Sequence, residues 1–203
     1  MFDVNNKKKQ KILNQLKSLS SIERKIISFT YFSSEEIQCL INYCSQLTFR
    51  EASPLTKTGV IQDFSICFPA PKVGAMEKCI NHFNLIFSDP KLECFFSSIL
   101  EFNDIAVQKY EEGSSGIGIH RDGQRYRDLI LIICLSGQSD FFITNDRNGS
   151  STQVIDDTPG RLIMMAGPGF RTLRAPSQRL LHGVKNVKKG RLSLGLRCDT
   201  KLL

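Results

Sequence analysis

The spacing of hydrophobic residues divides the chain into a helical first half and a strand-rich second half. Ile12, Leu13, Leu16 and Leu19 recur at helical spacing behind a lysine cluster, which predicts an amphipathic helix over 7–19. A capping-box sequence at Ser33 to Glu36 predicts that a second helix begins there. Including that second helix, the remaining predicted helices cover 33–47, 75–87 and 90–101.

From residue 104 onward the pattern changes to short runs rich in β-branched, aliphatic and aromatic residues, separated by turn residues. The expected strands are 105–110, 117–120, 129–135, 140–144, 152–155, 162–166, 180–187 and 192–198. Many short strands in succession are typical of two packed antiparallel sheets. We therefore predict an α+β chain with a mainly β core, a double-stranded β-helix (a cupin-like jelly roll) that the N-terminal helices buttress.

The same boundary gives the expected organisation of the 203-residue chain. Residues 1–103 should hold the helices and, at 48–72, a loop with short strands in which Pro54, Gly59 and Pro69 interrupt helical continuity. Residues 104–203 should form the β core. A chain of this length suits one compact domain with a substantial core.

Two of the three histidines lie in a pattern that suggests a metal site. His120 and Asp122 are two residues apart at the end of a predicted strand, so both side chains can project from one face. His182 follows in a later strand-like run and would complete a 2-His-1-carboxylate set, which holds non-haem Fe(II) and leaves positions open for O₂ and a co-substrate. A lone His-x-Asp is common at strand edges and turns, but the later His182 and two arginines favour the metal hypothesis. His82 is expected to be a packing or capping residue.

The last predicted strand places polar or small residues on one face and leucines on the other. Arg191, Ser193, Gly195 and Arg197 share a face because side chains in a strand alternate with a period of two. Two arginines that face inward are costly unless they meet anions. A dicarboxylate such as 2-oxoglutarate would supply those charges, because a guanidinium group matches a carboxylate with two hydrogen bonds. The alternative is a strand whose arginines face solvent.

From about residue 104 to 198 the chain resembles the AlkB-like branch of the Fe(II)/2-oxoglutarate-dependent dioxygenases. Beyond the residues already described, the resemblance includes Gln108-Lys109-Tyr110 before the metal strand and the Gly-Arg-Leu-Ile-Met-Met-Ala-Gly run at 160–167. The family closes with Arg-x-Asn-x-Thr-x-Arg, and here Ser193 and Gly195 stand at the Asn and Thr positions.

The resemblance implies a role for each motif residue. His120, Asp122 and His182 would hold Fe(II), while Tyr110 and Arg191 would bind the distal carboxylate of 2-oxoglutarate. Arg197 would lie near the metal-binding end of the co-substrate, and Gln108 and Ser193 would complete the co-substrate site. The implied reaction uses O₂ to convert 2-oxoglutarate to succinate and CO₂ and hydroxylates a substrate C–H bond. Hydroxylation of an N-methyl group would release formaldehyde.

Composition favours an intracellular setting. Seven scattered cysteines without a Cys-x-x-Cys pair argue against a disulfide framework or a zinc ribbon. The first ten residues are polar and lysine-rich, and no apolar signal region follows them. A membrane span needs about 20 apolar residues, and no apolar run approaches that length. We therefore expect a cytoplasmic protein without membrane attachment.

The net charge of +7 bears on the substrate. Arginines gather around the metal motif, and Arg121 and Arg125 are candidate substrate contacts. The other basic residues in this region are Arg127, Arg171, Arg174, Arg179, Lys185, Lys188 and Lys189. Such a rim suits the phosphates of single-stranded or duplex nucleic acid, or simply solvates a basic enzyme. By resemblance, the segment 48–72 would be a substrate-recognition lid, with Phe64 and Phe68 available to stack on an extracted base.

Three functional hypotheses follow from the sequence. The first is a 2-oxoglutarate oxygenase that demethylates alkylated nucleic-acid bases, which predicts salt-sensitive binding of oligonucleotides. The second is a 2-oxoglutarate oxygenase that hydroxylates a small molecule or a protein side chain and uses the basic rim for an acidic group. The third is a catalytically silent cupin-like binding module, against which the intact metal and arginine positions argue.

Overall fold

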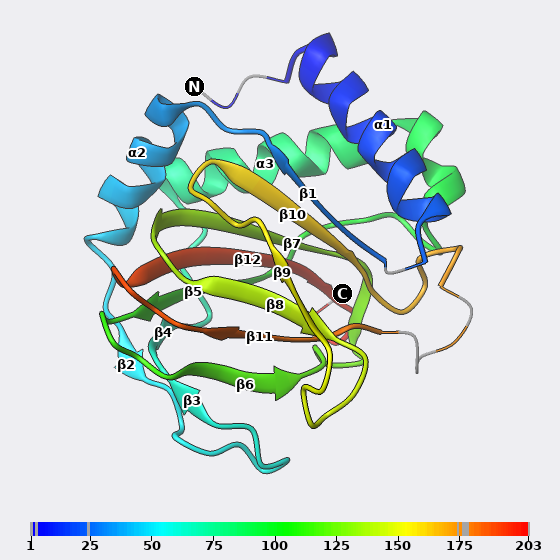
Figure 1. The fold of residues 1–203 in the computed structure, drawn as a ribbon. Helices are drawn as coiled ribbons and strands as arrows, with labels where there is room; N and C mark the ends of the chain where they lie inside the picture. Colours follow the sequence, from blue (N-terminus) through cyan, green and yellow to red (C-terminus); the bar gives the residue numbers. More distant parts are fainter. Residues whose placement is uncertain (1, 3, 24, 174, 176–178, 203) are drawn as a thin grey trace.

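The computed structural model describes residues 2, 4–23, 25–173, 175 and 179–202. Figure 1 shows an N-terminal group of helices beside a stack of strands. The helices are α1 (Asn6–Ser21), α2 (Ser34–Cys44), α3 (Gly74–Phe87) and the 3₁₀ helix η1 (Pro90–Phe95). The strands are β1 (Ile26–Thr30), β2 (Arg50–Glu51), β3 (Gln62–Asp63), β4 (Ser65–Cys67), β5 (Asp104–Tyr110), β6 (Gly116–His120), β7 (Tyr126–Gly137), β8 (Asp140–Thr144), β9 (Thr152–Ile155), β10 (Arg161–Ala166), β11 (Leu181–Lys185) and β12 (Arg191–Asp199).

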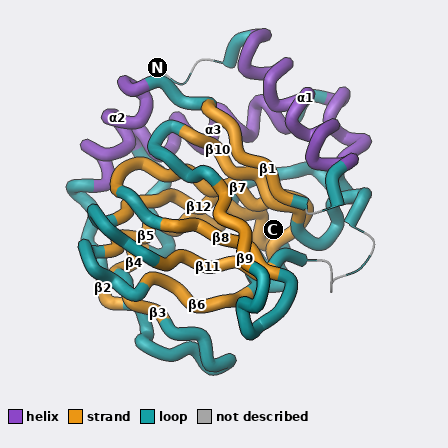
Figure 2. The backbone as a smooth tube through the Cα atoms, in the orientation of Figure 1, coloured by secondary structure: helices purple, strands orange, loops and turns teal. Residues whose placement is uncertain are grey.

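The strands form two antiparallel sheets. The larger sheet has seven strands in the order β1-β10-β7-β12-β5-β4-β2, and the smaller has five in the order β3-β6-β11-β8-β9. Figure 2 shows the helices gathered on one side of the strands. This arrangement confirms the predicted double-stranded β-helix with N-terminal helices against it.

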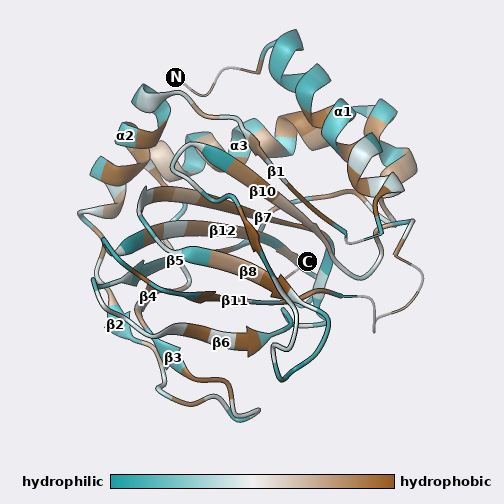
Figure 3. Cartoon of the chain, viewed as in Figure 1, coloured by the Kyte–Doolittle hydropathy of each residue, from teal (hydrophilic) through white to brown (hydrophobic). Residues whose placement is uncertain are grey.

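The inner strand β7 of the larger sheet explains why the two sheets and the helices pack as layers. Leu129, Leu131 and Ile133 project into a core shared with α1, α2 and α3, whereas Ile130 and Ile132 project into a second core between the sheets. Strands that are buried on both faces read as continuous apolar runs. Figure 3 shows this as mostly hydrophobic colouring along β7 and β10.

Local signals in the sequence fix the helix starts. The side chain of Ser33 accepts a hydrogen bond from the Glu36 N–H, and the Glu36 carboxylate accepts one from the Ser33 N–H, so the predicted capping box is present. The helix ends at Cys44 rather than near 47. His82 is buried and lies 2.7 Å from the hydroxyl of Tyr31, which agrees with its expected packing role.

The structure also differs from the sequence expectations at one further helix and at one strand. The helix expected over 90–101 is a 3₁₀ helix that ends at Phe95, because Ser97 leaves the helical path to donate its backbone N–H to the buried carboxylate of Asp128 (2.8 Å). The strand β1 was not expected. In the sheet it pairs with β10, at the edge. In the sequence, a short apolar run between two helices was the one pattern that indicated a strand there.

Two findings concern the cysteines and the helices. All seven cysteines are free thiols in the structure, including the exposed Cys94. None of the helices in the described ranges has both the length and the apolar character that crossing a bilayer requires.

Candidate active site

The three predicted metal ligands meet where β6 of the smaller sheet ends. His120 is the last residue of β6, and His182 lies directly opposite it in β11. Their rings are 4.3 Å apart between centroids. Asp122 follows two residues after β6, and each of the three residues offers one ligand atom such that all three atoms lie within 4.8 Å of one another. The local sequence therefore places two ligands, and antiparallel pairing brings the third.

A β-bulge turns His120 towards its partner. The register of β6 and β11 pairs His182 with His120 and Val184 with Ile117, so two residues of β6 lie opposite Gly183 alone. Ile117 and His120 consequently face the same cavity although they are three residues apart. Gly183 permits this approach, since a Cβ atom there would lie 2.7 Å from the carbonyl oxygen of Ile117.

The ring hydrogen bonds of both histidines leave Nε2 available to a cation. Nδ1 of His120 lies 2.9 Å from the carbonyl oxygen of Gly118, and Nδ1 of His182 lies 3.3 Å from that of Leu180. A proton on Nδ1 donates to the carbonyl and leaves the lone pair of Nε2 free for a cation. Burial, helped by the neighbouring His182, lowers the pKa of His120 to about 4. His120 is therefore neutral at physiological pH.

The carboxylate of Asp122 is divided between an arginine and the metal position. Its Oδ1 accepts from Nε of Arg197 at 3.0 Å. Its Oδ2 is buried, has no hydrogen-bond donor among the described residues and lies 3.3 Å from Nε2 of His182. Burial by itself would raise the pKa of Asp122, but Arg197 and the two histidines offset it and hold that pKa well below its usual range. A buried anion and two imidazole lone pairs that face one another suit a divalent cation.

Arg191 lies at the other end of the same cavity. It is 3% exposed and pairs with Tyr110 in the register of β12 and β5. Its Nη1 donates to the hydroxyl of Ser193, and its Nε lies 3.1 Å from Oδ2 of Asp157. Its Nη2 is buried without a hydrogen-bond partner among the described residues. A buried N–H group of this kind is costly unless a bound acceptor satisfies it, so the residues fit an anionic ligand at this end.

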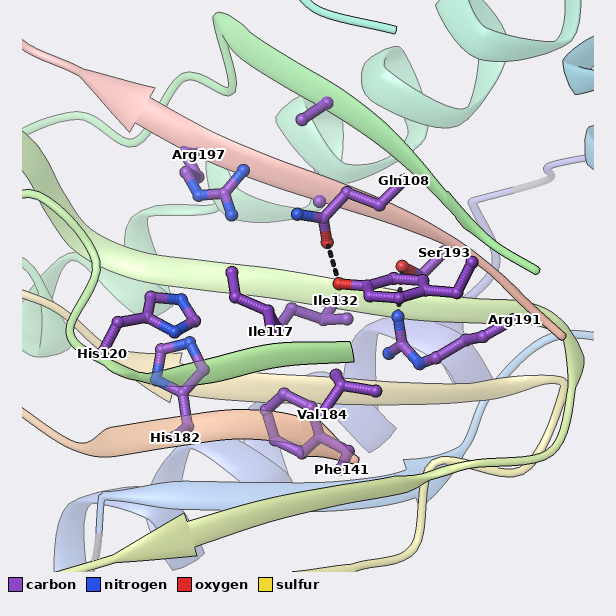
Figure 4. Close-up of a pocket in the computed structure, with 13 residues that line it drawn as sticks. Gln108, Ile117, His120, Ile132, Phe141, His182, Val184, Arg191, Ser193 and Arg197 are labelled. Carbon is purple, nitrogen blue, oxygen red and sulfur yellow. Dashed lines mark hydrogen bonds between the residues drawn. The ribbon is translucent and has the colours of Figure 1, made fainter. Parts of the chain in front are cut away.

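The cavity between these two ends joins the predicted co-substrate residues. Figure 4 shows Arg191, Ser193 and Gln108 at one end and His120 and His182 at the other. The hydroxyl of Tyr110 donates to Oε1 of Gln108 at 3.3 Å. The lining residues not yet named as ligands are Ala106, Ile117, Ile132, Phe141, Val184 and Gly195. Charged groups at both ends and an apolar middle match a short dicarboxylate that has one end at the metal.

The predicted face of the last strand is confirmed. Arg191, Ser193, Gly195 and Arg197 all line the cavity, while Leu194 and Leu196 lie in the core beneath the helices. Gly195 leaves room for the second arginine, because a Cβ atom there would lie 2.9 Å from Nη1 of Arg197.

The four residues predicted to contact substrate do not gather at this cavity. Phe64 is 4% exposed and its ring packs 4.9 Å from that of Tyr110, so core packing occupies it. Phe68 is half-buried and precedes the cis peptide bond to Pro69. Neither phenylalanine lines the cavity that holds the metal ligands. Their role in substrate binding stays a prediction.

Two arginines expected at the rim have different surroundings. Nε of Arg121 donates to the carbonyl oxygen of Arg179 at 2.9 Å, close to the metal ligands. Arg125 pairs with Asp199 at 2.8 Å and with Asp104 at 3.7 Å. Both substrate assignments therefore remain predictions.

The wider basic rim is only partly at the metal end. Nη1 of Arg179 donates to the backbone oxygen of Asp122, which places this guanidinium beside the triad. Arg127 and Arg171 instead bond to the segment 96–97, and Lys185 lies over the ring of Phe142. Arg174 lies outside the described residues.

Sequence analysis missed two residues of the site. Asp157 had no signal beyond being one of two adjacent aspartates in a predicted loop. Tyr126, whose ring lies 5.2 Å from the guanidinium carbon of Arg197, was hidden in a basic stretch that pointed to solvent. Both depend on chain segments that are far apart in sequence.

Comparison with known proteins gives the fold a context. No family model matches the sequence, and no curated protein matches it significantly. The structure is similar to a prolyl hydroxylase from Trichoplax adhaerens in complex with a hypoxia-inducible-factor peptide, at a TM-score of 0.69 and 16% identity over 96% of this chain and 92% of that one. This chain has the fold of the 2-oxoglutarate and iron(II) oxygenases.

Two further structures agree with that fold. A prolyl-4-hydroxylase from Pseudomonas putida has a TM-score of 0.65 at 12% identity, over 93% of this chain and 98% of that one. The viral collagen prolyl hydroxylase of Paramecium bursaria Chlorella virus-1, solved with 2-oxoglutarate, has a TM-score of 0.61 at 16% identity, over 85% and 94%. These neighbours do not single out the AlkB-like branch that the sequence suggested.

Proposed function

We propose that this protein is an Fe(II)- and 2-oxoglutarate-dependent oxygenase that hydroxylates a C–H bond in a protein or peptide substrate. The observation that carries the proposal is one cavity lined by His120 and His182 at one end and by Arg191, whose Nη2 is unsatisfied among the described residues, at the other. A ligand atom of Asp122 lies within 4.8 Å of the two histidine nitrogens and completes the triad. The third hypothesis, a silent binding module, explains neither the facing ligand atoms nor the buried Nη2 group.

Each group of the chain has a defined task in this reaction. Nε2 of His120, Nε2 of His182 and Oδ2 of Asp122 would hold Fe(II). When bound, the iron supplies the activation of O₂ that couples decarboxylation of 2-oxoglutarate to substrate hydroxylation. Arg197 keeps Asp122 ionised and holds its Oδ1, which leaves Oδ2 as the oxygen that would bind the metal.

The co-substrate end orients the dicarboxylate and excludes water. Arg191 would donate through Nη2 to the distal carboxylate, with the hydroxyl groups of Ser193 and Tyr110 beside it. Burial raises the pKa of Tyr110 to about 12, so this phenol stays protonated and can donate. The apolar walls, which include Ile132 and Phe141, keep the space between the two ends dry and strengthen both electrostatic contacts.

Three considerations favour a protein or peptide over a nucleic acid. Three of the solved neighbours are prolyl hydroxylases, and one of these is in complex with a peptide. The ring of Phe64, which would stack on an extracted base, is buried against Tyr110. Arg179 beside the triad suits an acidic group near the carbon to be hydroxylated.

The test is succinate formation from 2-oxoglutarate with Fe(II) and ascorbate, in the presence of either a peptide library or methylated oligonucleotides. We expect peptides with acidic residues to stimulate turnover and to gain one oxygen atom by mass spectrometry. Stimulation by oligonucleotides with release of formaldehyde would establish the demethylase instead. Asp122→Ala should abolish succinate formation, and retained turnover in that variant would refute the metal assignment.

A further inference from the structure

The guanidinium of Arg191 is held on two sides before any co-substrate arrives. Its Nε contacts Oδ2 of Asp157 at 3.1 Å, and its Nη1 donates to Ser193. Only Nη2 is without a partner among the described residues. The side chains of Arg191 and Asp157 are 2% and 9% exposed, so water screens this ion pair little.

Hydrogen bonds of the surrounding loop fix the position of Asp157. The neighbouring Asp156 turns outward, is 53% exposed and pairs with Arg161 at 3.1 Å. Three residues after Asp157, Gly160 donates its N–H to the carbonyl oxygen of Cys134. The carbonyl oxygen of Gly160 accepts from the N–H groups of Tyr31 and Phe32, at 3.0 Å each. The loop between β9 and β10 is thereby tied to β7 and to the chain after β1.

The ion pair has two opposite effects on an incoming carboxylate. Asp157 orients the guanidinium so that Nη2 is the free donor, which lowers the entropic cost of binding. Its negative charge also repels a second carboxylate on the same guanidinium. Between like charges on one guanidinium in a partly desolvated site, this repulsion corresponds to roughly tenfold or more in affinity.

We propose that Asp157 is a positioning residue that sets how strongly the site prefers a dicarboxylate over a monocarboxylate. It holds Arg191 in place and at the same time neutralises part of its charge, so it weakens the hold on the distal carboxylate. This inference rests on the proposed function, because it concerns the co-substrate of that reaction.

The test compares binding of two keto acids, without turnover. 2-Oxoglutarate and 2-oxopentanoate share the keto-acid end, but only the first has a distal carboxylate. With Mn(II) in place of iron and oxygen excluded, calorimetry gives both affinities for the wild type and for Asp157→Asn. The amide keeps an acceptor for Nε of Arg191 and removes the charge. We expect 2-oxoglutarate to bind roughly tenfold more tightly to Asp157→Asn, and the affinity for 2-oxopentanoate to stay the same.

Loss of a purely orienting role would weaken the binding of 2-oxoglutarate alone, and general damage to the site would weaken both ligands. Either result, or an unchanged ratio of the two affinities, would overturn the inference. The matched control is Asp156→Asn, the adjacent and exposed carboxylate, which should leave both affinities unchanged. If the wild type itself binds no 2-oxoglutarate, the proposed function fails and not merely the role of Asp157.

The Asp157→Asn variant leaves Arg191 as a buried cation without its counter-charge, so its folding needs a separate measurement. If the metal-loaded variant is unstable, 2-oxoglutarate should raise its thermal midpoint more than that of the wild type, because the ligand carboxylate replaces the missing charge. 2-Oxopentanoate should give no such difference. Equal rises with 2-oxoglutarate for the variant and the wild type would count against the proposal.

Discussion

His120 lies directly across from His182 in the pairing of β6 and β11, and a bulge beside this pair turns both rings into one cavity. The metal position therefore depends on the register of two strands as much as on the identity of the ligands. This relationship makes the centre sensitive to changes in the backbone that leave every ligand in place.

The first prediction separates the histidine ligands from the third histidine of the chain. His182→Ala should reduce Mn(II) affinity at least 100-fold, because it removes one of the three ligands of the proposed centre. His82→Gln should leave Mn(II) affinity unchanged, because His82 contacts Tyr31 and the carbonyl of Phe2. Metal titration by calorimetry decides between them, and a loss of affinity in His82→Gln would contradict the assignment.

The second prediction concerns the glycine opposite the bulge. Gly183→Ala should lower the free energy of unfolding by about 1–3 kcal/mol and weaken metal binding, because its Cβ atom would lie 2.7 Å from the backbone of Ile117. Gly118→Ala on the facing strand is the matched control, since its Cβ atom would find ordinary contacts at 3.5 Å and beyond. Urea unfolding and metal titration of both variants measure the difference. Equal effects would show that the close approach at 183 is unimportant.

The third prediction follows from the pKa of His120, which burial lowers from 6.5 to about 4. Between these values the unfolded chain binds a proton that the folded protein rejects, so the stability of the metal-free protein falls as the pH falls through this window. The loss from this one group is about 3 kcal/mol at most.

Urea unfolding at several pH values with a chelator measures this effect. The pKa values of Asp104 and Asp157 are raised by burial, so these groups act with the opposite sign, but they are the same in His120→Gln. The difference between wild type and His120→Gln therefore isolates the histidine. If the free energies of unfolding of the two proteins change in parallel with pH, His120 does not contribute to the pH dependence.

The fourth prediction concerns the co-substrate end. Arg191→Gln should raise the KM for 2-oxoglutarate at least tenfold, because the charge that meets the distal carboxylate is lost. Arg161→Gln is the control, since this arginine pairs with the exposed Asp156 on the surface. Steady-state succinate assays on both variants give the comparison, and an unchanged KM in Arg191→Gln would reject its role in binding the carboxylate.

Much of the fold, and the part of the site on the last strand and at His120 and Asp122, follow from the spacing of residues along short segments of the sequence. Alternation with a period of two places Arg191, Ser193, Gly195 and Arg197 on one face, and the structure confirms that face. The same period predicted that the side chains of His120 and Asp122 project from one face. Burial of β7 on both faces likewise follows from its continuous apolar run, because a strand without polar alternation has no face for water.

Only the tertiary structure decided which distant segments complete the site. Asp157 reaches Arg191 across 34 residues, the backbone N–H of Ser97 donates to Asp128, and the ring of Phe64 packs on that of Tyr110. No local pattern encodes these contacts, because each depends on how loops and sheets fold over one another and on which buried charge needs a partner. The sequence thus determined the strands, their faces and the chemical nature of the ligands. The packing of the two sheets determined how the ligands are oriented and which charges are already paired.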